Sequence, residues 1–341
     1  MYYEYICRIM KIHKFKAFMV SAFLSSMSVL CADVYKLVEP TKIAKYEDIT
    51  FYLRMPNSWD VEADRKNMFN EPIPAVRGLI AVCTWQTRAD DIRGNLEMKG
   101  RFSHIIKFAE ENNLAVICWT NFKGYRHNED TVDFEEERAE RYEKDYDKRA
   151  REWEMGFKRI CKKYSLPMHD TMLYGISGGG QMGHRLALRK PDYFFGVHMH
   201  VNSSYDALSD DANEVLWLVT TGTREYGYPA GQRFYRDGLK KGYHMIFRAE
   251  ENLGHSSSPE TEALTLKFFD YCLKFIPDPT DENWKKPEVD QFYFMRYPTY
   301  VGDYFNQEAF PVKQAEEYVT PEFMVALPTK EIAEAWGTVI E

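Results

Sequence analysis

Short, nearly continuous apolar runs alternate along the chain with longer amphipathic stretches. Six of these runs have the length of a β-strand, and they cover residues 78–85, 114–120, 171–176, 195–201, 215–222 and 244–249. Apolar side chains at nearly every position indicate strands in a sheet that is covered on both faces. Because helical stretches separate the strands, the pattern predicts an α/β protein with a doubly wound, mostly parallel sheet and helices on both faces.

Three further segments complete the expected organisation. Residues 133–164 are highly charged, but their aromatic and apolar side chains recur at steps of three and four, which is typical of a surface helix with one buried stripe. We expect residues 46–56 to add an antiparallel strand at the edge of the sheet. Residues 277–341 are rich in Pro, Tyr and Phe without a clear period. We expect them to form an extension that packs on a main domain of residues 33–276, not a second domain.

The first 32 residues have the pattern of an export signal. Lys11, Lys14 and Lys16 precede the apolar run AFMVSAFLSSMSVL, and the small residues of CAD then offer a cleavage point near Ala32. That run is too short to span a bilayer comfortably, and no later segment approaches the roughly 20 apolar residues of a membrane helix. We therefore expect a secreted or periplasmic protein without an integral membrane segment in the mature chain; the alternative is an uncleaved anchor.

Charge and cysteine usage exclude several classes of protein. The formal net charge is −8, and it becomes about −11 once residues 1–32, with four basic and one acidic side chain, are removed. So acidic a surface argues against nucleic acid as a partner. No C-x-x-C spacing occurs among the cysteines, which excludes the common zinc and redox motifs and leaves the disulfide state of four cysteines open. These are Cys83, Cys118, Cys161 and Cys272.

A serine lies between glycines where one predicted strand ends and a helix begins. Residues 175–179 read GISGG and fit G-x-S-x-G, in which glycines allow the sharp turn that exposes the nucleophile Ser177. The helical residues that follow, GQMGHRLALRKP, carry an apolar stripe and end at a proline. The alternative interpretation is a glycine-rich turn with an incidental serine.

A serine hydroxyl needs a base, and that base needs an acid to orient it. The best candidate base is His255, on a Gly-Ser-rich loop between the last apolar run and a helix that Ser258 can cap. Catalytic groups of such sheets collect on loops at the carboxyl ends of strands. Glu225 lies just beyond the strand 215–222 and is the preferred acid. Its rivals follow the preceding strand, first Asp206 and then Asp210 and Asp211.

The chain order Ser177, Glu225, His255 resembles that of the α/β-hydrolase superfamily and differs from that of chymotrypsin-like and subtilisin-like proteases. The resemblance covers roughly residues 45–276 and is carried by GISGGG, GTRE and NLGH. Within the superfamily, the sequence looks most like secreted esterases related to feruloyl esterases and polyhydroxybutyrate depolymerases. The resemblance implies the α/β-hydrolase fold.

In an elbow of the G-x-S-x-G kind, two backbone N–H groups near the serine form the oxyanion hole. Gly178 opens the helix and supplies the first N–H. Many relatives of this kind carry His-Gly after the third strand to supply the second, but here the stretch reads VCTWQTRADD, so by position Gln86 or Trp85 would donate instead. Trp85 and Tyr226, which follows the acid candidate, are also candidates to line an apolar or aromatic substrate pocket.

The sequence therefore predicts a secreted serine hydrolase that cleaves a small-molecule or polymer carboxylic ester through an acyl-enzyme and needs no cofactor. His198 and His200 alternate onto one face of a strand, but no third ligand accompanies them, so we expect structural histidines and no metal site. Two alternatives remain at this stage. One is a serine peptidase of the prolyl-oligopeptidase kind, and the other is a binding protein that keeps the fold without turnover.

Overall fold

The computed structural model describes residues 41–46, 49–59, 76–84, 89–120, 135–278, 281 and 283–341. The export signal expected at residues 1–32 lies outside them. Within the described part of the chain, no helix is both long and apolar enough to cross a membrane.

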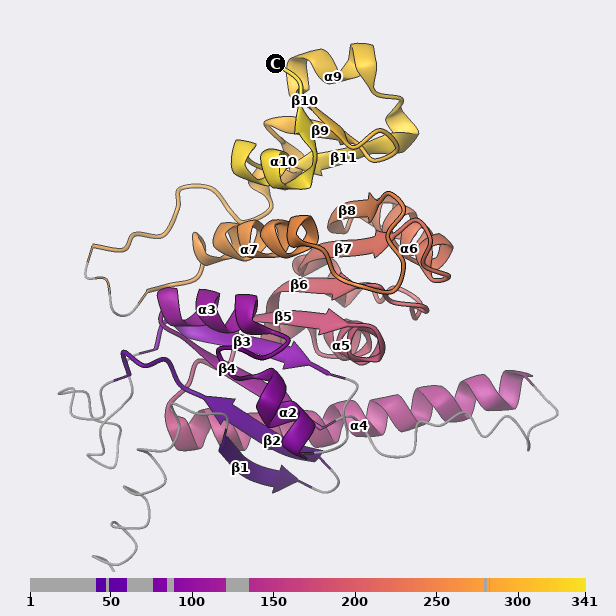
Figure 1. Cartoon of the computed structure of the whole chain (residues 1–341). Helices are drawn as coiled ribbons and strands as arrows, with labels where there is room; N and C mark the ends of the chain where they lie inside the picture. The colour runs from indigo at the N-terminus through magenta and orange to yellow at the C-terminus, as the bar shows by residue number, and fades with distance from the viewer. Residues whose placement is uncertain are drawn as a thin grey trace, which may run out of the picture.

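An eight-stranded sheet in the order β1-β2-β4-β3-β5-β6-β7-β8 forms the centre of the molecule (Figure 1). Its strands are β1 (Thr41–Tyr46), β2 (Ile49–Arg54), β3 (Gly78–Cys83), β4 (Leu114–Trp119), β5 (Thr171–Ile176), β6 (Phe194–His200), β7 (Leu216–Gly222) and β8 (His244–Glu250). All neighbours from β4 to β8 run parallel. Each of the six apolar runs forms one strand from β3 to β8, so the predicted mostly parallel sheet is confirmed.

The antiparallel part of the sheet differs in one respect from the expectation for residues 46–56. Strand β2 pairs antiparallel with β4, as expected, but β1 pairs antiparallel with its other side. The edge strand is therefore β1, and β2 lies inside the sheet. The difference has a simple cause, because Tyr46 pairs with Ile49, so β1 runs back along β2, and β1 carries Lys42 and Lys45, which are exposed.

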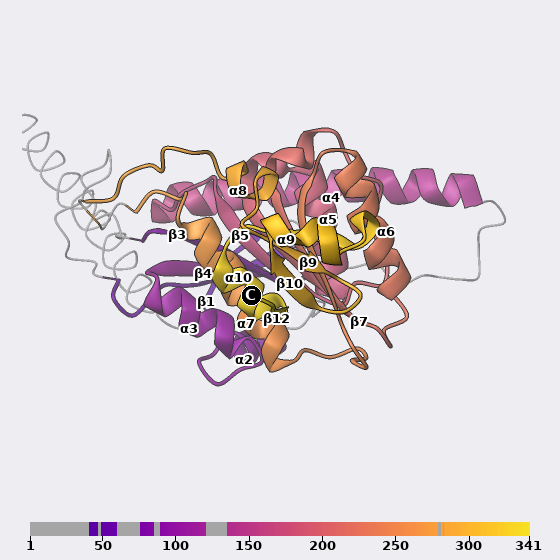
Figure 2. The same ribbon diagram turned by 90° about the horizontal axis from the view of Figure 1, so that it is seen from above.

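Helices cover both faces of the sheet, which confirms the doubly wound arrangement. In the view from above, α3 and α7 lie on one face, and α4, α5 and α6 lie on the other (Figure 2). The helices of this unit are α2 (Ala89–Asn95), α3 (Ser103–Glu111), α4 (Glu135–Tyr164), α5 (Gly178–Arg189), α6 (Tyr228–Lys240) and α7 (Pro259–Leu273).

Helix α4 buries the aromatic stripe that its sequence predicts. The ring of Trp153 stacks on Phe157 with 4.7 Å between the ring centroids and meets Trp119 of β4 edge-on at 5.4 Å. All three side chains are fully buried. The charged side chains of Lys148 and Lys158 remain exposed, so the charge run is a solvated face of the helix.

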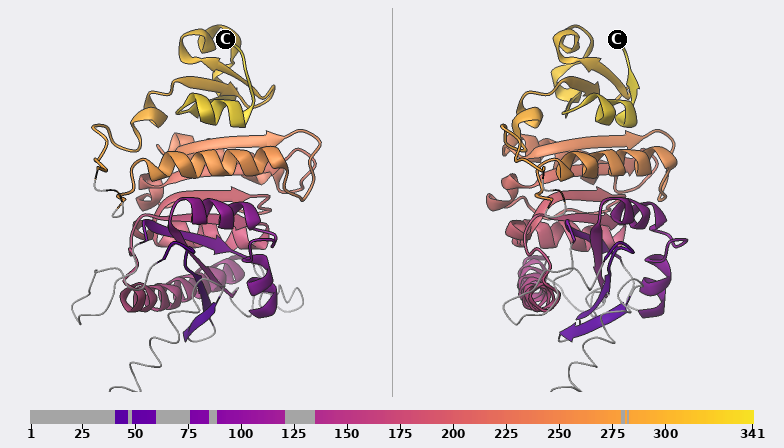
Figure 3. Two further views of the ribbon diagram at one scale, coloured as in Figure 1. Left: turned by 60° about the vertical axis from the view of Figure 1, so that its left-hand side comes forward. Right: turned by 90° about the vertical axis from the view of Figure 1, so that its left-hand side faces the viewer.

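Residues beyond α7 form a second, smaller sheet in the order β11-β9-β10-β12. Its elements are α8 (Tyr293–Arg296), β9 (Tyr300–Asp303), β10 (Glu308–Pro311), α9 (Val312–Tyr318), β11 (Met324–Leu327), α10 (Lys330–Trp336) and β12 (Thr338–Val339). This unit sits beyond β8 and α7 at one end of the main sheet (Figures 1 and 3). The fully buried Trp336 joins the two, because its Nε1 donates a hydrogen bond to the carbonyl of Phe247 in β8 at 2.8 Å.

Candidate functional site

Ser177 occupies a strained turn between β5 and α5. Its φ of 56° and ψ of −130° lie outside the regions that non-glycine residues usually adopt. Two backbone hydrogen bonds hold the turn: the N–H of Ser177 donates to the carbonyl of His200 at 2.9 Å, and the N–H of Gln181 donates to the carbonyl of Ser177 at 3.0 Å. A strand, a sharp turn and a helix are the arrangement that exposes a nucleophilic hydroxyl.

Two glycines of the motif are required by close backbone contacts. A Cβ on Gly175 would lie 2.8 Å from the Cα of Gly180, so the turn could not close. A Cβ on Gly179 would lie 2.2 Å from the carbonyl oxygen of Cys83 and 2.9 Å from the Cα of Thr84. The first turn of α5 therefore packs directly against the end of β3.

The structure brings Ser177, His255 and Glu225 together. The Nε2 of His255 lies 2.7 Å from the Oγ of Ser177, and its Nδ1 lies 2.9 Å from the Oε2 of Glu225. A carboxylate can only accept, so Nδ1 carries the proton and Nε2 is left to accept from the serine hydroxyl. Glu225 is buried, whereas the side chain of His255 is 47% exposed and within reach of solvent.

Backbone hydrogen bonds join the loop that carries Glu225 (the acid loop) to the loop that carries His255 (the histidine loop). These loops follow β7 and β8 at the carboxyl edge of the sheet. The N–H of Thr223 donates to the carbonyl of Glu250 at 2.9 Å, and the N–H of Arg224 donates to the carbonyl of Leu253 at 3.0 Å. Because the two loops are fixed to each other, Glu225 and His255 keep their separation without depending on the Glu225–His255 contact alone.

Asp206, the rival acid, lies in a different cluster. Its carboxylate forms ion pairs with Arg185 at 2.7 Å and with Arg189 at 3.0 Å, and its backbone N–H donates to the Nε2 of His184 at 3.0 Å. Burial would raise the pKa of Asp206, but His184 and the two guanidinium groups outweigh burial and lower it. Burial itself lowers the pKa of His184 to about 3, so at neutral pH the two arginines are the cations facing this carboxylate.

One of the two expected oxyanion donors can be located. Gly178 is the first residue of α5, so its backbone N–H has no acceptor within the helix and lies at the positive end of the helix dipole. Trp85 and Gln86 lie outside the described residues. Thr84, which directly precedes them, is the residue that packs beside Gly179, but the second donor and the role of Trp85 remain predictions.

Tyr226 adjoins the acid and faces solvent. Its side chain is 77% exposed, although that of the preceding Glu225 is buried. The ring is therefore available to a bound molecule, and its role in substrate binding remains a prediction.

His198 and His200 share one hydrogen-bond partner. The Nε2 of His198 and the Nδ1 of His200 lie 2.7 Å and 2.8 Å from the Oγ1 of Thr220, and both histidines are fully buried. Among the described residues, no three His, Cys, Asp or Glu side chains cluster in a way that could hold a metal. The alternating pattern of VHMHV indicated this pair. Sequence reasoning missed that the carbonyl of His200 also accepts the backbone N–H of Ser177 in the sharp turn between β5 and α5 (the elbow).

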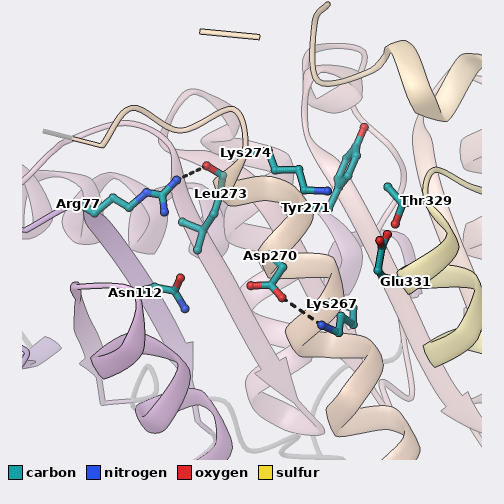
Figure 4. Close-up of a pocket in the computed structure, with 9 residues that line it drawn as sticks. All are labelled: Arg77, Asn112, Lys267, Asp270, Tyr271, Leu273, Lys274, Thr329 and Glu331. Atoms are coloured by element: carbon teal, nitrogen blue, oxygen red, sulfur yellow. Dashed lines mark hydrogen bonds and ion pairs between the residues drawn. The ribbon is translucent and has the colours of Figure 1, made fainter. Parts of the chain in front are cut away.

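A separate pocket of about 320 Å³ lies at the other end of the strands, beside α7, with Arg77 and Asn112 on one side and the start of α10 on the other (Figure 4). Arg77 precedes β3 and donates to the carbonyl of Leu273 at the end of α7, and Lys267 pairs with Asp270 at 3.6 Å. None of the residues that line the pocket belongs to the Ser177 site, so this pocket is not its substrate cleft. The lining residues are Arg77, Asn112, Lys267, Asp270, Tyr271, Leu273, Lys274, Thr329 and Glu331.

No family model and no curated protein matches the sequence. Among solved structures, an alpha/beta hydrolase enzyme from a Medee basin deep-sea metagenome library is similar at a TM-score of 0.47 and 10% identity, covering 69% of this chain and 98% of that one. The carboxylesterase of Bacillus cereus is similar at a TM-score of 0.45 and 12% identity, over 66% and 94% of the two chains. A ferulic acid esterase is similar at a TM-score of 0.40 and 14% identity, over 63% and 90%.

At these TM-scores and identities, the similarities do not by themselves assign this chain to a family. The fold is that of the α/β-hydrolases, because the parallel strands, the strained serine turn and the chain order of serine, acid and histidine occur together.

Proposed function

We propose that the protein is a serine hydrolase that cleaves carboxylic esters, with Ser177 as nucleophile, His255 as general base and acid, and Glu225 as the residue that orients His255. The observation that carries this proposal is the pair of hydrogen bonds on His255, at 2.7 Å to Ser177 and 2.9 Å to Glu225. The first distance is within the hydrogen-bond reach that a general base needs, and the second allows the carboxylate to orient the imidazole.

The reaction follows from this arrangement in two halves. In the first, the Oγ of Ser177 attacks the ester carbonyl while Nε2 of His255 takes its proton, and the N–H of Gly178 donates to the developing oxyanion. When the tetrahedral species collapses, Nε2 gives that proton to the leaving alcohol and an acyl-serine remains. Water then attacks the acyl-serine with His255 again as base, releasing the acid and restoring the serine hydroxyl.

The exposure of each group suits its task. The carboxylate of Glu225 is almost inaccessible, so water does not compete for its hydrogen bond to Nδ1 of His255. The imidazole of His255 is 47% exposed, which leaves room for an alcohol to depart and for the hydrolytic water to arrive.

Hydrolysis of a short p-nitrophenyl ester by the purified protein tests the proposal. The wild type should turn the ester over, and Ser177→Ala should lose about 10⁶-fold in kcat, as expected when a triad nucleophile is removed. An unchanged far-ultraviolet circular dichroism spectrum would show that the variant is folded. Equal activity in the two proteins, or hydrolysis of peptide amides but not of esters by the wild type, would contradict the proposal.

A further inference from the structure

We propose that His200, oriented by Thr220, is a positioning residue that holds the loop of His255 at a fixed distance from Ser177; this rests on the proposed function. His200 is the last residue of β6 and is fully buried. It lies in the middle of the sheet, next to β5, which carries the nucleophile. A residue in this place can act as a rigid link between two catalytic elements.

His200 contacts both elements directly. Its backbone carbonyl accepts the N–H of Ser177 at 2.9 Å. Its ring Nε2 lies 3.0 Å from the carbonyl oxygen of Ser256, the residue that follows His255. The nucleophile and the base are therefore tied to the same residue, one through its main chain and the other through its side chain.

Proton counting fixes the state of the His200 ring. The carbonyl of Ser256 can only accept, so Nε2 of His200 carries the hydrogen. Burial lowers the pKa of His200 to about 4, so near neutral pH the ring is neutral and Nδ1 must accept. The only hydroxyl within hydrogen-bond distance of Nδ1 among the described contacts is that of Thr220, at 2.8 Å, and it donates its single proton there.

The proton positions on His198 follow in the same way, and the series of hydrogen bonds ends at Thr265, away from the site. Because the Thr220 proton goes to His200, Nε2 of His198 must donate to Oγ1 of Thr220, at 2.7 Å. Nδ1 of His198 is then left to accept from the hydroxyl of Thr265 at 3.1 Å, although this hydroxyl also faces the carbonyl of Thr261 at 2.7 Å. The single hydroxyl proton of Thr265 faces two acceptors, so the acceptor that lacks a full hydrogen bond lies at Thr265, far from the site. The hydrogen bond from His200 to Ser256 is not affected.

The histidine loop gains a restraint from this link that its own sequence does not supply. Residues 254–257 read GHSS, and a Cβ added at Gly254 would meet no atom within 4 Å. The hydrogen bond from Arg224 holds the loop at Leu253, before His255, and His200 adds a second hydrogen bond at Ser256, directly after it. Without the donor on His200, the carbonyl of Ser256 loses its hydrogen bond to the sheet. A displacement of about 1 Å at a reacting group can cost about 100-fold in rate.

Three amide variants separate positioning from general stability. His200→Asn is too short to reach Ser256, whereas His200→Gln can place an N–H near the original Nε2. His198→Asn is the matched control, because His198 is equally buried on the same strand and bonds the same Thr220, but its other ring nitrogen faces Thr265 of α7 instead of the loop.

Two readouts are compared for each protein. The first is kcat and KM on a p-nitrophenyl ester, and the second is hydrogen–deuterium exchange of the peptide that covers residues 251–258. His200→Asn should lower kcat by about 10- to 100-fold, with KM changed less than about threefold, and should speed exchange of this peptide. His200→Gln should recover most of kcat and of the protection. His198→Asn should keep the wild-type kcat and loop protection even where its melting temperature falls as far as that of His200→Asn.

Thr220→Val, of nearly the same volume, serves if His200→Asn is recovered unfolded. It removes the donor that fixes Nδ1 of His200 as an acceptor, so kcat and loop protection should fall in the same direction. Equal kcat losses in His200→Asn and His198→Asn, or wild-type kcat and loop protection in Thr220→Val, would overturn the positioning role. If the wild type hydrolyses no ester but His200→Asn alone loosens the loop, the proposed function fails and the positioning role stands.

Discussion

Replacing Glu225 by glutamine removes the charge that faces the imidazole and keeps the shape of the side chain. In the transition state His255 is an imidazolium, and the carboxylate oxygen lies 2.9 Å from its Nδ1. With an effective dielectric constant of about 20, the attraction at this separation is about 6 kcal/mol. Because the imidazole is 47% exposed, water screens part of it. We therefore expect a loss of about 4 to 5 kcal/mol, which lowers kcat by about 10³- to 10⁴-fold.

The assay compares kcat and KM of Glu225→Gln with those of Asp206→Asn on the same ester. Because Asp206 faces Arg185 and Arg189 and not His255, Asp206→Asn should keep kcat within about threefold of the wild type. KM should change little in Glu225→Gln, since substrate binding precedes the proton transfer that places a charge on His255. A Glu225→Gln variant within tenfold of the wild-type kcat, or a large loss in Asp206→Asn alone, would refute the assignment of the acid.

Three further outcomes are expected. Gly179→Ala should lower the kcat for ester hydrolysis by about 100-fold or more, because its Cβ would lie 2.2 Å from the carbonyl oxygen of Cys83 and must push the elbow away from β3; wild-type kinetics would contradict this. Asp206→Asn should lower the free energy of unfolding by about 3 kcal/mol at pH 7 in urea titrations. The pKa of Asp206 is lower in the folded state than in the unfolded state. The difference in free energy of unfolding between wild type and variant should therefore be fully present above the unfolded pKa of about 4 and vanish as pH falls through the folded pKa. A difference that persists in acid would exclude the ion pairs as its cause. N-terminal sequencing of protein recovered outside the cytoplasm should begin near Ala32 or Asp33, and an intact Met1 there would exclude cleavage.

Much of the main sheet could be predicted from the sequence because its strands are buried on both faces. A strand such as β5, all of whose residues are buried, leaves a continuous apolar run that a half-exposed strand would not. The smaller sheet gave no comparable signal, because β12 has two residues and β9, β10 and β11 have four each. Segments this short carry no measurable period.

The choice between two acids could not be made from the sequence alone. Glu225 and Asp206 both follow parallel strands, and placement alone favoured neither strongly. The two carboxylates differ in their contacts with distant segments: the histidine loop is hydrogen-bonded to the acid loop at Arg224, and Asp206 is bonded to α5. A partial signal was present, because Arg185 and Arg189 are four residues apart and so share one face of the elbow helix, ready to pair with a nearby carboxylate.

The role inferred for His200 shows a different limit of sequence reasoning. The alternation of VHMHV indicated that both histidines share a face, but not which atoms face them. The partners Thr220 and Ser256 come from β7 and from the loop after β8, respectively. Only the parallel register of β6 against β7, which places His200 opposite Thr220, brings them together.

Site-resolved labelling by a fluorophosphonate tests the central claim most directly, because the reagent reacts with a serine whose hydroxyl is activated far faster than with other side chains. The purified wild type should gain one label per chain, and mass spectrometry of the digested protein should locate it on Ser177. Ser177→Ala should take up none, and Glu225→Gln should be labelled far more slowly. A label on any other residue, or a folded wild-type protein that takes up no label, would contradict the assignment of Ser177 as the nucleophile.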